Sequence, residues 1–244
     1  MITLCKEWDE LKFLPSDAFA ARITALALTY GFEQKFALFW VQKDEEKPVA
    51  AISRVDGSMT LCCTEKADFE ELAAFVNAVG YSALIGNEKD ISKLGLSESK
   101  SSYIVEYKGK TVPDENGISW DCDKRKVYDL LCDCGFEMGD YGAFLADYCS
   151  RLNKGTARLA TFEENDLLAC ASALFIGEKS VLLGAVATRK SARGRGLASK
   201  LVTALAEEER DKKVFLFCRN DSLLDFYKKI GFESIGRWSE INNL

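Results

Sequence analysis

A short basic segment that contains two glycines is the part of this sequence whose residue types best suggest chemistry. The run VATRKSARGRGLA occupies residues 186–198. We expect an apolar strand to end near Thr188 and an amphipathic helix, 196–210, to begin at Gly196, while Gly194 lies in the loop between them. A helix N-terminus offers free N–H groups and a positive dipole end, and glycines let a ligand approach the backbone closely. The segment therefore predicts a loop that binds phosphate or pyrophosphate.

The spacing argues against two common phosphate-binding motifs. A P-loop needs GxxxxGK[ST], which this sequence lacks. A dinucleotide fold needs its glycine turn directly after the strand and an acidic residue at the end of the next strand. Here residues 189–192 separate the strand from the glycines, and the next expected strand, 214–218, is followed by Arg219 and Asn220. A structural role, in which the glycines only cap and pack a helix, stays open.

A second motif follows the loop and gives the sequence a resemblance to a known family. The segment NDSLLDFYKKIGF (220–232) is similar to the pattern Nx(4–6)FYxKxGF, and the run RGRGLA from Arg193 is similar to [Q/R]xxGx[G/A]. Both patterns are signatures of the GNAT acetyltransferase superfamily. The wider run resembles the subgroup pattern VxTxPxxRGxGxAxxL, except that Arg189 and Lys190 replace the prolines and make the loop more basic. The two signatures cover about residues 150–240.

The resemblance implies the mixed-sheet α/β (α+β) GNAT fold, with acetyl-CoA as cosubstrate in a cleft where two parallel strands separate. Backbone groups of the strand would pair with the pantetheine arm, and amides of the loop would surround the pyrophosphate. The residues expected to bind the cofactor are Val186, Ala187, Thr188, Arg193, Gly194, Arg195, Gly196, Leu197, Ala198, Ser199 and Asn220.

The resemblance also implies that Tyr227 lies near the thioester sulfur, where it would be the catalytic acid. An amine that attacks a thioester needs a proton acceptor, and the departing thiolate needs a proton donor. A tyrosine, with a pKa of about 10, stays protonated at neutral pH and can supply that proton. The alternative is a core aromatic, since Leu223, Phe226 and Ile230 share its helix face.

The general base is left open by the sequence. No carboxylate occurs in the expected strand 180–186. Asp140, Glu163, Glu164 and Glu178 lie on expected loops and are the candidates, although each also suits a solvated surface. A water relay or a group from the first half of the chain are the other possibilities.

The predicted function is N-acetyl transfer from acetyl-CoA directly to an amine of a small molecule or peptide. A non-catalytic acyl-CoA-binding sensor or scaffold is the alternative. Transfer of a longer acyl group, or transfer to an acceptor other than nitrogen, is a third possibility.

Around this segment, the second half of the chain predicts alternating helices and strands. The expected helices are 126–131, 144–152, 196–210 and 222–230, and the expected strands are 157–162, 167–176, 180–188, 214–218 and 233–238. Gly177 and Glu178 form a tight connection between two of the strands, which predicts a hairpin. This order predicts a mixed α/β sheet.

The first half repeats that order more weakly, which predicts two copies of one fold. The expected helices are 17–30, 68–79 and 91–94, and the expected strands are 36–42, 49–54, 58–62 and 82–85. The counterpart of the phosphate loop, 62–69, has no glycine and carries Glu65 and Asp68. This arrangement resembles tandem two-domain GNAT proteins in which one copy has lost the cofactor site. The resemblance implies a degenerate GNAT-like domain at 1–110, a linker at 111–120 and a catalytic domain at 121–244. The first domain would brace the second and shape its acceptor pocket.

Composition narrows the possible function classes further. The 244 residues contain no histidine, which removes histidine-based triads and imidazole bases, and we expect no metal site. The nine cysteines are expected to be reduced and mostly buried. The net charge of −6, with no basic excess in either half, argues against a nucleic-acid partner. No apolar run reaches the roughly 18 residues of a membrane helix, and the first residues are too charged for a signal peptide. We expect a cytoplasmic protein without a membrane partner, a monomer or homodimer, that acts on an amine-bearing small molecule or peptide.

Overall fold

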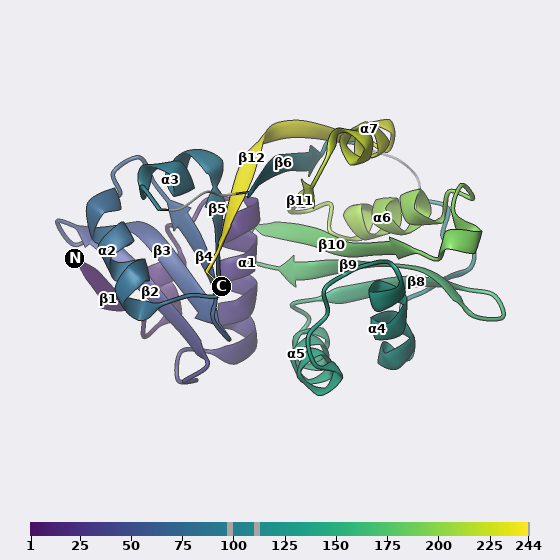
Figure 1. Cartoon of the computed structure of the whole chain (residues 1–244), viewed down its shortest axis with the longest axis horizontal. Helices are drawn as coiled ribbons and strands as arrows, with labels where there is room; N and C mark the ends of the chain where they lie inside the picture. Colours follow the sequence, from purple (N-terminus) through teal and green to yellow (C-terminus); the bar gives the residue numbers. More distant parts are fainter. Residues whose placement is uncertain (97–99, 110–112, 244) are drawn as a thin grey trace.

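The computed structural model describes residues 1–96, 100–109 and 113–243. In these residues twelve strands form one mixed sheet in the order β1-β2-β3-β4-β5-β12-β6-β11-β10-β9-β8-β7 (Figure 1). The strands are β1 (Ile2–Leu4), β2 (Ala37–Asp44), β3 (Lys47–Val55), β4 (Ser58–Cys63), β5 (Ala83–Asn87), β6 (Lys100–Tyr107), β7 (Ile118–Ser119), β8 (Arg158–Glu163), β9 (Leu167–Ile176), β10 (Ser180–Thr188), β11 (Lys213–Cys218) and β12 (Phe232–Asn242). The helices are α1 (Ala18–Tyr30), α2 (Phe69–Val79), α3 (Glu88–Lys93), α4 (Lys124–Asp133), α5 (Tyr141–Asn153), α6 (Leu197–Glu208) and α7 (Asp221–Lys229), with 3-10 turns at Trp8–Leu11 and Lys190–Ala192. Among the described residues, no helix has both the length and the apolar character needed to cross a membrane. The expected mixed α/β class is confirmed.

The order of elements repeats along the chain, but the last strands of the two halves are exchanged. The first half runs β4-α2-β5-α3-β6 and the second runs β10-α6-β11-α7-β12. In each half the two strands that flank the first of these helices pair in parallel. However, β6 pairs with β11, where Tyr103 is opposite Cys218, while β12 pairs with β5, where Trp238 is opposite Asn87. β6 and β12 also pair with each other, so the sheet is continuous across both halves.

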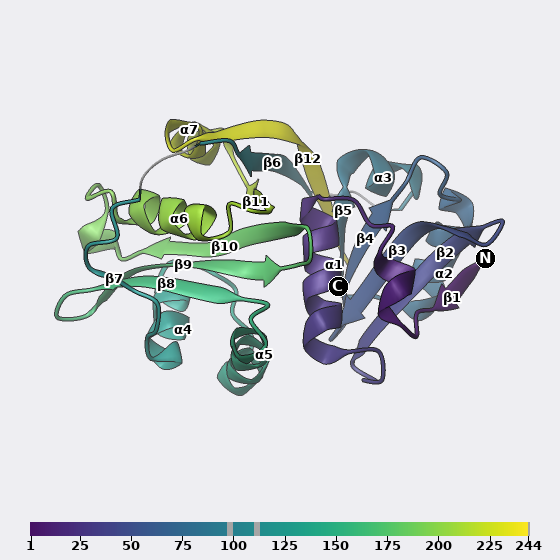
Figure 2. The same cartoon turned by 180° about the vertical axis from the view of Figure 1, so that it is seen from behind.

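Helix α1 lies between the halves and contacts strands of both, including β4 and β10 (Figures 1 and 2). The Asp17 side chain caps the helix, and the Asp17 carbonyl accepts a hydrogen bond of 2.8 Å from the Ser180 hydroxyl. The β9–β10 turn approaches α1 so closely that a Cβ at Gly177 would lie 2.2 Å from Thr24 Oγ1 and 3.1 Å from Ala21 Cα. A helix packed on both sides needs apolar residues around most of its circumference, and α1 has them.

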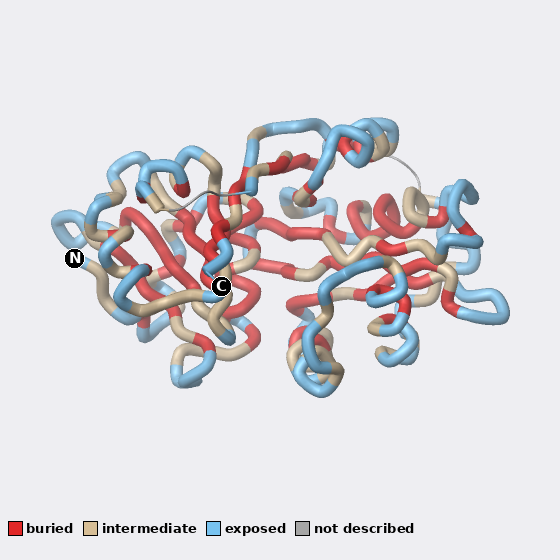
Figure 3. Tube along the Cα trace, in the orientation of Figure 1, coloured by how far each residue is buried: buried red, intermediate tan, exposed pale blue. Residues whose placement is uncertain are grey.

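The sheet of the second half is covered on both faces. Figures 1 and 2 show α6 and α7 on one side of β8–β10, and α4 and α5 on the other. Side chains alternate along β9, so that Ala169 and Ala171 pack in one core with Leu201 of α6, while Cys170 packs in another with Leu130 of α4. The central strands are buried, and exposure is concentrated in the turns and outer helix faces (Figure 3). Helices therefore cover both faces of the strands that lead to the loop at 189–196.

The sequence expectations for helices and for most strands agree with the structure to within a few residues. β12 extends to Asn242, beyond the expected end at Trp238, and β1, β6 and β7 were not expected as strands. β7 falls inside the expected linker 111–120, and residues 110–112 of that region lie outside the described residues. All nine cysteines lie in the described part of the chain, and each is a free thiol. Only four of them, Cys5, Cys62, Cys170 and Cys218, are buried, so the expectation that most are buried is wrong.

Candidate functional site

Strands β10 and β11 separate part-way along their length. They pair in parallel from Ser180 opposite Lys213 to Leu183 opposite Leu216, although β10 continues to Thr188. The pairing of β10 with β9 is also irregular between Gly184 and Ala187. At this irregularity Ala185 has a φ of 49°, a left-handed conformation that costs a residue with a Cβ about 1–2 kcal/mol. A bulge of this kind turns the strand away from its neighbour and opens a cleft.

The glycine loop follows this bulge and leads into α6. Gly194 and Gly196 have φ values of 82° and 77°, which glycine adopts without steric cost. Gly196 is the N-cap residue of α6, and no side chain caps the helix there. The first N–H groups of α6 have no acceptor within the helix, because an α-helix leaves its first turn unpaired. No heavy atom lies within 4 Å of a Cβ built at either glycine, so the space in front of the loop is open. The arrangement favours an anion at the N-terminus of α6.

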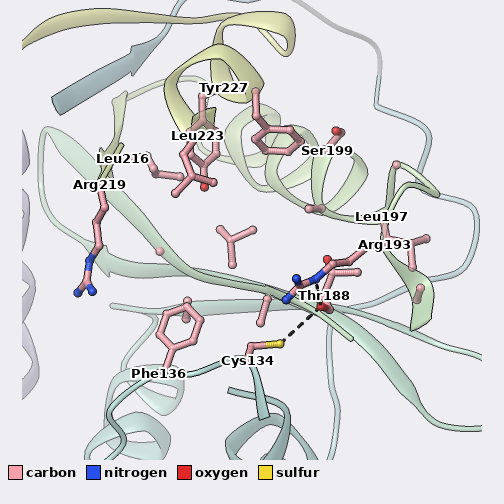
Figure 4. Close-up of a pocket in the computed structure, with 18 of the residues that line it drawn as sticks. Cys134, Phe136, Thr188, Arg193, Leu197, Ser199, Leu216, Arg219, Leu223 and Tyr227 are labelled. Atoms are coloured by element: carbon pink, nitrogen blue, oxygen red, sulfur yellow. Dashed lines mark hydrogen bonds between the residues drawn. The ribbon is translucent and has the colours of Figure 1, made fainter. Parts of the chain in front are cut away.

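The cleft and the loop form a cavity of about 520 Å³ (Figure 4). Its lining comes from β10, the glycine loop, α6, β11, α7 and the segment after α4. The lining residues are Cys134, Phe136, Gly184, Ala185, Val186, Ala187, Thr188, Ala192, Arg193, Gly194, Gly196, Leu197, Ala198, Ser199, Leu216, Phe217, Arg219, Leu223, Phe226 and Tyr227. Apolar walls with two arginines and no carboxylate among these residues suit an elongated ligand that carries both apolar and anionic groups.

Tyr227 reaches this cavity from α7 and is only 4% exposed. Its ring packs edge-on against Phe226 at 5.0 Å and against Phe232 at 5.7 Å between centroids. Among the described residues, no group forms a hydrogen bond with its hydroxyl, whose oxygen is not fully buried and opens into the cavity. Burial raises the pKa of Tyr227 well above its usual value, so the hydroxyl is protonated at neutral pH.

Thr188, at the end of β10, is a second lining residue with an unused polar atom. Its Oγ1 is buried and has no hydrogen-bond partner among the described residues. Its carbonyl accepts hydrogen bonds from Cys134 Sγ at 3.5 Å and from Arg193 Nε at 3.3 Å. Those two bonds hold the segment after α4 and the start of the glycine loop against the end of β10.

The structure brings together most of the predicted site residues but leaves two outside the cavity lining. The predicted residues that line the cavity are Val186, Ala187, Thr188, Arg193, Gly194, Gly196, Leu197, Ala198, Ser199 and Tyr227. The Arg195 side chain forms an ion pair with Glu164 instead. The Asn220 side chain caps α7 by accepting a hydrogen bond of 2.9 Å from the Leu223 N–H. Arg195 and Asn220 do not line the cavity, and cofactor binding by these two residues stays a prediction.

None of the four candidate bases lines the cavity. Glu163 forms an ion pair with Lys126, Glu164 pairs with Arg195, and Asp140 caps α5. Glu178 lies in the turn at the opposite end of β10 from the glycine loop.

Sequence reasoning missed the contribution of Cys134 and Phe136. They follow α4 and carry no motif that separates them from an ordinary loop. Their position in the cavity depends on how α4 packs against β9 and β10.

The family comparison gives a match in the second half of the chain. The model of the family described as "Acetyltransferase (GNAT) family" matches residues 124–232. These residues form a GNAT family domain. No curated protein matches the chain.

Solved GNAT structures resemble the whole chain in fold. An acetyltransferase from the GNAT family of Colwellia psychrerythraea has a TM-score of 0.57 at 14% identity, with both chains covered completely. A putative GNAT acetyltransferase from Novosphingobium aromaticivorans has a TM-score of 0.58 at 15% identity, over 92% of this chain and 97% of the other. A tandem GNAT protein from the clavulanic acid biosynthesis pathway has a TM-score of 0.57 at 13% identity, over 96% and 93%. Acyl transfer in general is the activity to which this GNAT fold and family match point.

Proposed function

We propose that this protein is an acetyl-CoA-dependent N-acetyltransferase that moves an acetyl group directly to an amine of a small molecule or peptide in the cytoplasm. The observation that carries the proposal is the cavity between the separated ends of β10 and β11. It joins the open N-terminus of α6 at one side to the Tyr227 hydroxyl at another. The GNAT match over residues 124–232 supports the same chemistry.

The lining fits acetyl-CoA in its chemistry. The backbone around Gly194 and Gly196 and the side chain of Arg193 offer donors and positive charge to a pyrophosphate. Apolar side chains and the backbone of β10 beyond its pairing with β11 suit a pantetheine arm, which carries amides on an aliphatic chain. When bound, acetyl-CoA would supply an acetyl group activated as a thioester.

Tyr227 is assigned as the proton donor in this proposal. As acetyl moves, a C–N bond forms and a C–S bond breaks, the amine loses one proton, and the thiolate gains one. The hydroxyl of Tyr227, which is protonated at neutral pH and belongs to a ring packed in the core, suits the second role. Since no carboxylate lines the cavity in the described residues, the amine would lose its proton through water.

The same lack of a lining carboxylate favours one alternative. A chain that binds acyl-CoA as a sensor or scaffold would need the glycine loop and the apolar walls but no base. Tyr227 would then be a core aromatic, as its contacts with Phe226 and Phe232 also permit.

We also propose that residues 1–110 are a degenerate copy of the GNAT fold, with 111–120 as the linker and 121–244 as the catalytic copy. The repeated order of elements and the likeness to a tandem GNAT protein support this division. The counterpart of the glycine loop, between β4 and α2, has no glycine, and its Asp68 caps α2. A carboxylate at a helix N-terminus competes with any phosphate there.

Calorimetric titration of acetyl-CoA and of free CoA tests the proposal. We expect micromolar binding to the wild type and none to Gly196→Glu, because a carboxylate would occupy the phosphate position. Gly80→Glu is the control, since Gly80 has a similar φ of 75° and equally open surroundings but ends α2. Amines would then be screened by thiol release. No binding to the wild type would contradict both the enzyme and the sensor, whereas binding without turnover on any amine would favour the sensor.

A further inference from the structure

A second cavity, of about 340 Å³, lies where the two halves of the chain meet. Its walls are α1 from the first half, and α5 with the α4–α5 loop from the second. Figures 1 and 2 show α1 and α5 next to each other where the two halves meet. The volume suits a small organic ligand.

Arg22 of α1 lines this second cavity and carries a positive charge that no carboxylate of the described residues contacts directly. Its Nη2 donates a hydrogen bond of 2.9 Å to the Ser58 hydroxyl, while its Nε is buried and has no partner. No carboxylate of the described residues forms an ion pair with it. Burial, followed by repulsion from Arg151, lowers the pKa of Arg22 to about 10, while the carboxylates of Glu240 and Asp147 act in the opposite direction, so the guanidinium is charged at neutral pH.

Arg151 of α5 lies nearby but is neutralised. Its Nε donates to Asp147 at 3.2 Å, and its Nη1 donates to the Leu174 carbonyl at 2.8 Å. The carbon atoms of both guanidinium groups lie close to the Phe175 ring centroid, 4.9 Å for Arg22 and 5.0 Å for Arg151. The Arg22 guanidinium therefore has no carboxylate in contact with it, although Asp147 and Glu240 attract it at longer range. Arg22 is half-buried, and a partly desolvated charge without a contacting partner gains free energy from an anionic ligand.

The rim of the second cavity has the opposite charge. Asp56, Glu137 and Asp140 line it and are exposed. Glu137 directly follows Phe136, which lines the first cavity, so one loop contributes to both cavities. A positive interior and a negative rim complement a ligand with a carboxylate at one end and an amine at the other.

We propose that the second cavity binds the acceptor, a small molecule with both an amine and a carboxylate, and that Arg22 recognises the carboxylate. This inference rests on the proposed function, because acetyl transfer is what defines an acceptor. The carboxylate would accept hydrogen bonds from the free donors of Arg22. The amine would lie at the acidic rim, beside the loop that lines the first cavity. Arg22 is then a specificity residue that contacts substrate away from the reacting atoms.

The test compares L-amino acids with their carboxamides on the full-length protein saturated with CoA. Calorimetry and thermal unfolding should show that at least one acid binds the wild type and raises its Tm, while the matched amide does not. Arg22→Met should raise the Kd of that acid roughly 30-fold or more, which corresponds to the loss of one buried charged contact. Arg22→Lys should have a Kd between those of the wild type and Arg22→Met, because a lysine keeps the charge but not the forked donors. Arg210→Met, at an exposed arginine beyond α6, should bind the acid as the wild type does.

The outcomes separate this inference from the proposed function. Equal binding of acids and amides by the wild type, or an acid preference retained in Arg22→Met, would overturn the carboxylate site. Acetyl-CoA binding is measured on the same variants and should not change. If an acid binds through Arg22 but mass spectrometry finds no acetylated product, its assignment as acceptor is overturned and it is an effector. If acetyl-CoA does not bind, the proposed function fails whatever the acids do.

Discussion

At the scale of single residues, Tyr227 combines burial with a hydroxyl that forms no hydrogen bond in the described residues. The hydroxyl oxygen is not among the fully buried side-chain atoms without a partner, so it opens into the cavity that the residue lines. Packing of the ring in the core therefore places a protonated hydroxyl where a bound ligand can contact it. Proton donation to that ligand is the role that this position suits.

Replacement of Tyr227 by phenylalanine tests the assignment. We expect kcat to fall by about 100-fold or more while the Kd of acetyl-CoA changes little, because only the proton donor is removed. Steady-state kinetics and calorimetry measure the two quantities. The control is Tyr148→Phe, at a buried tyrosine of α5 whose hydroxyl bonds Ser172 at 2.5 Å, where only stability should fall. If Tyr227→Phe keeps the wild-type kcat, the assignment of Tyr227 as the proton donor is wrong.

The pH dependence of kcat follows from the raised pKa of Tyr227. An acid with a raised pKa keeps its proton to higher pH, so its donating form persists beyond the ordinary tyrosine value of about 10. We expect kcat to rise with pH as the amine loses its proton, and to show no decline below about pH 10. Rates with a fixed amine, in buffers of constant ionic strength, measure the profile. A decline centred near pH 8 or 9 would show that some other group donates the proton.

At the scale of elements, the contact between α1 and the β9–β10 turn sets how the halves fit together. Gly177 is required there by the close approach of Thr24 and Ala21, and not by a left-handed backbone. Side chains larger than hydrogen therefore have no room.

Gly177→Ala should lower the free energy of unfolding by about 1–3 kcal/mol, as overpacking of a tight contact does. Urea denaturation measures the change. Adding Thr24→Ala should restore part of the loss, because the nearest atom to the new Cβ is Thr24 Oγ1, while Ala21 stays at 3.1 Å. Gly139→Ala is the control, since no atom lies within 4 Å of a Cβ there. If Gly177→Ala and Gly139→Ala change the free energy of unfolding equally, the contact between α1 and the β9–β10 turn is not tight.

Elements with a strong local pattern were predictable from the sequence, and features that depend on neighbours were not. The glycine loop and α6 follow from residue types and apolar spacing that lie within one short segment. The bulge at Ala185 escaped prediction because a non-glycine residue adopts the left-handed conformation there. The cavity contacts of Cys134 and Phe136, like the position of Arg22 in the second cavity, arise from the packing of distant elements and leave no local signal.

At the scale of the whole molecule, the exchange of β6 and β12 makes each half depend on the other. β6 comes from residues before 110, yet it lies between β11 and β12 and contributes Val105 to the core beneath α6 and α7. The two sequence halves are therefore not two separately complete sheets.

A fragment of residues 121–244 should accordingly fail to fold alone. It lacks β6, so β11 and β12 lose the strand that lies between them. We expect no dispersed amide spectrum and no acetyl-CoA binding, and we expect recovery when a fragment of residues 1–120 is added. The control is the full chain with a protease site inserted after Pro113 and cut after folding, which should keep its affinity. A folded 121–244 fragment that binds acetyl-CoA would contradict this expectation.

The exchanged strands also determine the order in which the sheet can form during synthesis. A ribosome completes β6 long before it makes β11 and β12, the two strands that will flank β6. Until then β5 and β6 present open edges, and unpaired edges invite association with other chains. Pairings between residues so far apart in sequence also form slowly. During synthesis the sheet of the first half therefore stays incomplete, and its exposed strand edges need protection, until β12 has left the ribosome exit tunnel.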